Sequence, residues 1–73
     1  MGNYVIIRHP GKLTTIYGHL SQILVKKNRF VRQGEVIGKV GKTGNANYRD
    51  IQPHLHFEVR KNGVPEDPLE YLQ

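Results

Sequence analysis

Short segments of alternating apolar and polar residues recur along the chain, and this period of two is typical of β-strands. Residues 54–60 (HLHFEVR) alternate without a break and form the clearest predicted strand. The apolar, β-rich segments 4–7 and 13–17 predict two more strands on either side of a His-Pro-Gly-Lys turn at 9–12. We therefore expect an antiparallel hairpin over residues 3–19.

The middle of the chain carries weaker signals. Residues 23–25 and 35–41 predict two short strands, and the glycine inside the second marks a bend or a close approach of two backbones. Residues 42–53 are polar and include one glycine, two asparagines and one proline. We expect an irregular loop there, of a length at which loops tend to be functional or disordered.

The last residues of the chain, from 62 onward, contain turn and helix-capping signals. Asn62-Gly63 follows the clearest strand after one residue and is the strongest short hairpin signal, so residues 64–65 should begin a returning edge strand. Asp67 and Pro68 suit the N-cap and the first position of a short helical turn. No helix of ordinary length is visible, so the predicted fold class is all-β, built from short antiparallel strands.

Length and composition limit what this fold can contain. The chain has 73 residues, so residues 1–73 form one domain or part of one. It has no cysteine, which excludes disulfides, thiolate metal ligands and a cysteine nucleophile. Small domains often gain stability from a metal or a partner subunit, and four histidines are the available nitrogen ligands.

The chain is basic, with 11 lysines and arginines against 6 acidic residues. The cations are spread out and dense only over residues 26–32, so a solvated surface is favoured over a polyanion-binding one. No aromatic-rich motif accompanies the charge, and no apolar run approaches the length of a membrane span. We expect neither a nucleic acid partner nor a membrane span, and no signal peptide within this chain.

The segment 54–60 carries the most informative chemistry. Side chains two apart in a strand stand on one face, so His54, His56 and Glu58 share a face opposite the apolar residues. The two imidazoles are about 7 Å apart at their Cβ atoms. They could serve one metal site, both as ligands or one as ligand and one as base. Spacing alone favours an ordinary solvent-facing pair, because an H-x-H triplet by itself is a weak signal.

Three other residues bear on that choice. His19 ends the second strand of the hairpin, where its side chain can project into a cleft, and this favours the metal site. His9 lies in the Pro-Gly turn, and we interpret it as a turn residue without a functional role. Glu58 could accept an imidazole N–H or pair with a nearby basic side chain, and both interpretations stay open.

Five motifs together resemble the lysostaphin-type (LytM-like) zinc metallopeptidases over residues 3–72. They are YGHL at 17–20, GEVIG at 34–38, GKTG at 41–44, HLHFE at 54–58, and NG at 62–63 followed by DPL at 67–69. The resemblance implies an all-β, barrel-sandwich-like domain. It also implies a zinc metalloendopeptidase that hydrolyses peptide bonds of bacterial peptidoglycan in the cell envelope.

The resemblance also implies residue roles. In that family zinc is held by the His and Asp of an H-x-x-x-D motif and by the second His of H-x-H, here His56. The first His of H-x-H, here His54, and the YGHL histidine, here His19, flank the metal-bound water. We assign His54 as candidate base and His19 as candidate oxyanion donor, although these two roles could be exchanged.

The chain departs from the family pattern at its N-terminal side. It has no H-x-x-x-D motif: Leu13 stands four residues after His9, and neither aspartate, Asp50 or Asp67, follows a histidine at that spacing. The chain therefore resembles the C-terminal part of a catalytic domain: either the motif lies upstream in a longer parent, or the protein has lost two of its three protein ligands. In isolation we expect weak or no zinc binding and no peptidase activity. The parent should carry the motif upstream, preceded by an export signal. Exposed strand edges predict a symmetric homodimer.

Other classes stay open. A non-catalytic LytM-like domain could bind the cell wall or activate a partner wall hydrolase, although such relatives usually lose histidines that this chain keeps. Residues 31–38 also resemble an element of biotinyl and lipoyl carrier domains. A carrier needs its modified lysine at an exposed hairpin tip beside Met or Ala, and Lys42 lacks that setting. A basic RNA-binding β domain is the least favoured class.

Overall fold

The computed structural model describes residues 2–41 and 52–72, and it is built almost entirely of antiparallel strands. In chain order the elements are β1 (Val5–His9), η1 (Pro10–Lys12), β2 (Leu13–Gly18), β3 (Leu20–Ile23), β4 (Gly38–Val40), β5 (His56–Lys61), β6 (Val64–Glu66) and η3 (Pro68–Glu70). The helical elements of these residues are short 3-10 turns, and none is long and apolar enough to cross a membrane. The predicted all-β class is confirmed.

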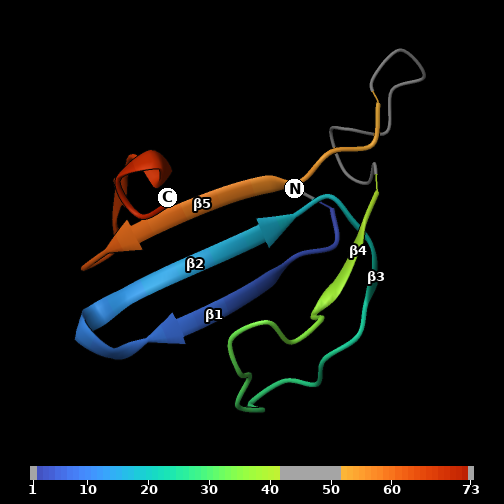
Figure 1. The fold of residues 1–73 in the computed structure, drawn as a ribbon, viewed down its shortest axis with the longest axis horizontal. Coiled ribbons are helices and arrows are strands. Elements are labelled where there is room, and N and C mark those ends of the chain that lie inside the picture. The colour runs from blue at the N-terminus through green and yellow to red at the C-terminus, as the bar shows by residue number, and fades with distance from the viewer. Residues whose placement is uncertain (1, 42–51, 73) are drawn as a thin grey trace.

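The strands form two sheets (Figure 1). The larger has the order β1-β2-β5-β6, and the smaller pairs β3 with β4 beside the end at which β2 leaves the larger sheet. The predicted hairpin over 3–19 is confirmed as the β1–β2 pair. The second predicted hairpin is confirmed as β5–β6, with Asn62 at φ 53° and Gly63 at φ 78°, the left-handed pair that a type I′ turn requires.

The C-terminal turn forms as the sequence indicates. Asp67 caps η3, since its Oδ1 accepts a hydrogen bond from the Leu69 backbone N–H at 3.0 Å. Pro68 occupies the first position, where its missing N–H costs no hydrogen bond.

The predicted strands in the middle of the chain are misplaced. The segment 23–25 was expected to form a strand, but β3 starts at Leu20 and ends at Ile23. Leu20 is held there by Asn3, whose carbonyl accepts its N–H and whose side-chain amide donates to its carbonyl, each at 3.0 Å. The predicted strand 35–41 shortens to Gly38–Val40, and most of the predicted loop 42–53 lies outside the described residues.

The buried apolar core of the described residues is small and lies along β2, β3 and β5. Ile16, Leu20 and Val59 are buried, and Val59 is only 1% exposed. Of the predicted core face of HLHFEVR, Val59 is therefore confirmed and Phe57 is half-buried. Leu55 was wrongly placed in the core: it precedes β5 and is 42% exposed.

This core generates a stability prediction. Val59→Ala should lower the free energy of unfolding by about 1–3 kcal/mol, because it removes buried methyl groups and leaves a cavity. Val64→Ala, in the neighbouring β6 where the side chain is 61% exposed, should change it by less than about 0.5 kcal/mol. Urea unfolding of the two variants measures the difference, and equal losses would contradict this placement of the core.

Candidate histidine site

The register between β2 and β5 places a glycine across from His56. Gly18 pairs with His56, and Tyr17 pairs with Phe57, their ring centroids 5.3 Å apart. Gly18 is buried and is the last residue of β2, and as a glycine it places no side chain beside His56. The residue that follows it in the chain, after β2 has ended, brings its own side chain close to His56.

That next residue is His19, and its backbone makes a sharp change of direction. Its φ is 60°, in the left-handed region that few residues other than glycine adopt, and the chain passes there from β2 into β3. The residue is buried, 8% exposed. Its ring centroid lies 4.9 Å from that of His54 and 5.6 Å from that of His56, both in edge-on geometry. The structure thus brings all three predicted site histidines together, with His19 in the middle.

His54 reaches the cluster from outside the strand in which the sequence placed it. It is exposed and precedes β5, which begins at His56. Two contacts hold it: its backbone N–H donates to the Gly41 carbonyl at 3.1 Å, and its Nδ1 lies 3.0 Å from the Gln52 carbonyl oxygen. A carbonyl oxygen only accepts, so in the neutral ring Nδ1 carries the proton and Nε2 has the lone pair.

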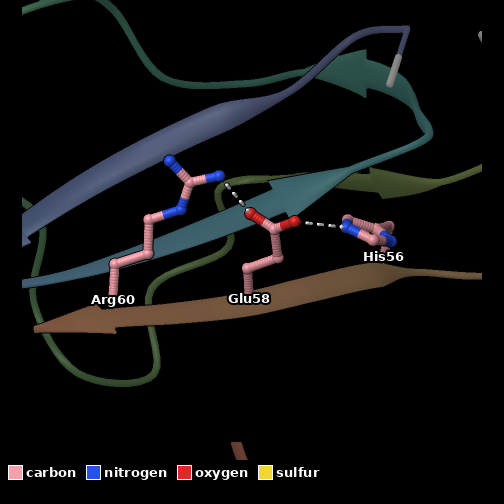
Figure 2. A network of polar contacts seen from close by, with 3 residues as sticks. All are labelled: His56, Glu58 and Arg60. Carbon is pink, nitrogen blue, oxygen red and sulfur yellow. Dashed lines mark hydrogen bonds and ion pairs between the residues drawn. The ribbon is translucent and has the colours of Figure 1, made fainter. Parts of the chain in front are cut away.

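His56 has a different partner (Figure 2). Its Nε2 lies 3.0 Å from Oε1 of Glu58, and the other oxygen of that carboxylate accepts from Nη2 of Arg60 at 3.1 Å. The three side chains stand in a row on one side of β5. A carboxylate accepts, so in the neutral ring Nε2 of His56 carries the proton and Nδ1 has the lone pair. Both interpretations left open for Glu58 therefore apply.

The same contacts set the charge of Glu58. The hydrogen bond from His56 lowers the pKa of the carboxyl below its ordinary value, and the hydrogen bond and positive charge of Arg60 add to this, against the opposing effect of desolvation. The side chain is therefore ionised at neutral pH. A carboxylate behind an imidazole fixes the ring orientation and strengthens the ring as a metal ligand.

His9 lies apart from this cluster. The prediction of a turn residue is wrong in detail, because His9 is the last residue of β1. Its Nε2 lies 2.8 Å from Oγ1 of Thr15 on the adjacent β2. This cross-strand contact gives His9 a structural role.

The imidazole nitrogens of this histidine cluster fit part of a zinc site. Unprotonated imidazole nitrogens at His56 and His54 are of the type that zinc binds. Within residues 2–41 and 52–72, however, no three histidine, cysteine or acidic side chains are arranged to hold one metal ion. The described residues thus supply ligands for a metal but not a complete set.

Gly41 is the residue that sequence reasoning missed. Its N–H donates to the His19 carbonyl at 3.0 Å, and its own carbonyl accepts from His54. The signal available was a glycine at the end of a predicted strand, which marks a close backbone approach without naming the partner.

Comparisons with known proteins agree with the motifs. The model of peptidase family M23 matches residues 1–68. The chain is 48% identical over 68 residues to the DD-carboxypeptidase/endopeptidase Mpg of Neisseria meningitidis, covering 93% of this chain and 15% of that protein. A zinc-containing peptidase from Vibrio cholerae superposes with a TM-score of 0.79 and 44% identity, over 90% of this chain and 19% of that one.

A further match does not carry a peptidase name. A chain in the crystal structure of the SpoIIIAH and SpoIIQ complex superposes with a TM-score of 0.83 and 39% identity, over 94% of this chain and 47% of that one. The present chain thus spans less than half of each of these relatives. Since the family model covers nearly the whole chain and the fold agrees, this chain belongs to peptidase family M23, the LytM-type peptidases.

Proposed function

We propose that this chain forms the C-terminal portion of a zinc metalloendopeptidase that hydrolyses peptide bonds of bacterial peptidoglycan. The observation that carries the proposal is the cluster in which the ring of His19 lies 4.9 Å from His54 and 5.6 Å from His56. The imidazole of His19 meets those of the H-x-H motif, 35 and 37 residues away in sequence, which unrelated surface histidines have no reason to do. Relatives named as peptidoglycan or DD-endopeptidases support the substrate class and a location in the cell envelope.

His56 is the proposed metal ligand, through Nδ1. Its Nε2–H donates to Glu58, which holds the ring in place and leaves Nδ1 available. The described residues hold no cluster of three metal-binding side chains, so we expect the remaining ligands to come from outside them. Zinc, when bound, acidifies its water and polarises the scissile carbonyl.

His54 and His19 are the proposed catalytic groups. The bond from Nδ1–H of His54 to the Gln52 carbonyl leaves Nε2 free to take a proton from the attacking water. His19 adjoins both other rings, so an imidazole N–H there can donate to the negative oxygen that develops on the substrate. The two roles remain exchangeable between these residues.

A non-catalytic binding domain is the second candidate. The observation that favours it is the similarity to a chain of the SpoIIIAH and SpoIIQ complex, a protein assembly named without reference to hydrolysis. Such a domain would bind the wall or a partner hydrolase and would need none of the three histidines. Histidine substitutions therefore separate the two candidates.

Substitutions in the parent protein test the assigned roles. His56→Ala should abolish zinc binding, whereas His54→Ala should leave zinc bound and reduce turnover by about 10²–10⁴-fold, the usual contribution of a general base. His9→Ala is the matched control, expected to cost about 1 kcal/mol of stability with turnover unchanged. Zinc content and hydrolysis of purified peptidoglycan are the measurements. Metal loss in His54→Ala but not in His56→Ala would show that the roles are reversed.

Glu58 offers a test of how His56 is held. Glu58→Ala should weaken zinc affinity by about 10–100-fold in the parent protein, since the imidazole loses the acceptor that orients it. Glu70→Ala, an exposed carboxylate in η3, serves as the control for the loss of one negative charge. Competition with a fluorescent chelator measures both affinities. Equal zinc affinities in the two variants would mean that the contact between Glu58 and His56 does not affect zinc binding.

The incomplete ligand set generates a third test. Isothermal titration of the 73-residue chain alone with Zn²⁺ should show weak or no binding, because the described residues lack a three-ligand cluster.

The parent reading frame should contain an H-x-x-x-D motif within a few tens of residues before Asn3. Tight zinc binding by the chain alone, or a natural start codon at Met1 with no such motif upstream, would contradict the proposal.

A further inference from the structure

The hydrogen bonds of Gly41 single it out within the histidine site. Its N–H donates to the carbonyl of His19 at 3.0 Å, and its carbonyl accepts the N–H of His54 at 3.1 Å. One peptide segment therefore links the backbones of the two residues proposed as catalytic. His56 has no part in this link, since it is held by the β2–β5 pairing and by Glu58.

The link has no room for a side chain. Gly41 is buried, and a Cβ built on it would lie 2.5 Å from Cβ of Ser21, 2.8 Å from its backbone N and 2.9 Å from its Cα. Two of these three atoms belong to the backbone, and the backbone fixes the position of the third, the Cβ, so no side-chain rotation relieves the overlap. Ser21 sits where the register of the β3–β4 pair shifts between Leu20 and Gln22, an irregularity of the kind that a β-bulge produces. A side chain at position 41 would therefore push the backbone away from β3.

We propose that Gly41 is a positioning residue, which sets the distance between the imidazoles of His19 and His54 through its two backbone hydrogen bonds. This inference rests on the proposed function for its effect on turnover. The predicted effect on the distance between the His19 and His54 rings does not depend on that function. A misplacement of about 1 Å can cost a reaction about 10²-fold, so a small shift of this link has a large effect.

Gly38 provides a matched control. A Cβ at Gly38 would lie 2.7 Å from the Gln22 carbonyl oxygen, so alanine there strains the same β3–β4 pair. Gly38 lies three residues from Gly41, and its pairing partner is Ile23 rather than a histidine. Gly41→Ala and Gly38→Ala should therefore destabilise the protein to a comparable degree, but only the first should disturb the histidines.

The experiment compares these two variants in the full-length parent protein. In Gly41→Ala we expect kcat for peptidoglycan peptides to fall about 10²-fold, with KM and zinc affinity unchanged. We expect nuclear Overhauser contacts between the ring protons of His19 and His54, in histidine-labelled protein, to disappear. Gly38→Ala should keep both kcat and these contacts.

Three results would overturn the inference. These are full turnover in Gly41→Ala, retained ring contacts in Gly41→Ala, or equal loss of turnover in Gly38→Ala. If the wild-type parent hydrolyses no peptide, the proposed function fails, and the ring contacts alone decide whether Gly41 positions the histidines.

A second variant covers the case in which Gly41→Ala does not fold. Combining it with Ser21→Gly removes the nearest of the three overlapping atoms and leaves the two backbone contacts. The double variant should fold with weakened ring contacts and reduced kcat. Lost ring contacts together with full kcat would refute the positioning role.

Discussion

The antiparallel register between β2 and β5 determines where the histidines can meet. Gly18 is the last residue of β2, and it pairs with His56, the first residue of β5. β2 therefore ends at the site and β5 begins there. Beyond the Gly18–His56 pair, neither segment continues the β2–β5 pairing. His19 turns away on one side, and His54 approaches on the other. A shift of one residue would move His56 and Glu58 to the opposite face.

Backbone strain accompanies this arrangement. A non-glycine residue in the left-handed region costs roughly 1–2 kcal/mol, and His19 has φ 60°. Glycine would adopt that conformation at no steric cost, but it would bring no imidazole to the cluster. The surroundings hold the strain in place: His19 accepts a bond from Gly41, and the following Leu20 is bonded to Asn3 at both its N–H and its carbonyl. Such strained residues gather at functional sites.

Local sequence patterns predicted the parts of the fold that depend on local contacts. The hairpin at Asn62-Gly63 and the cap at Asp67 follow from residue types whose backbone preferences act over two to four residues. Strand limits were less predictable, because pairing partners decide them. The alternation of HLHFEVR continues through His54, yet β5 starts at His56, where the partner strand ends. Likewise β3 starts at Leu20 because of bonds to Asn3, 17 residues away in sequence.

In the candidate site, too, the sequence predicted some features and not those that depend on distant segments. The motifs identified His19, His54 and His56, and the structure places their rings together. The link through Gly41 was not predictable, because it consists of two backbone hydrogen bonds to segments 22 and 13 residues away by numbering. Any residue has the N–H and carbonyl for such bonds, apart from the N–H of proline. Only the lack of space at Ser21 explains why the position is a glycine.

The two histidines of the H-x-H motif are held in opposite tautomers, and this makes them chemically different. His54 donates from Nδ1 to a neutral carbonyl, and His56 donates from Nε2 to an ionised carboxylate. A carboxylate partner strengthens an imidazole as a metal ligand, whereas a carbonyl partner fixes the ring without adding a charge. This asymmetry supports the proposed division between a metal ligand and a proton acceptor. The division arises from the partners Gln52 and Glu58 rather than from the histidines themselves.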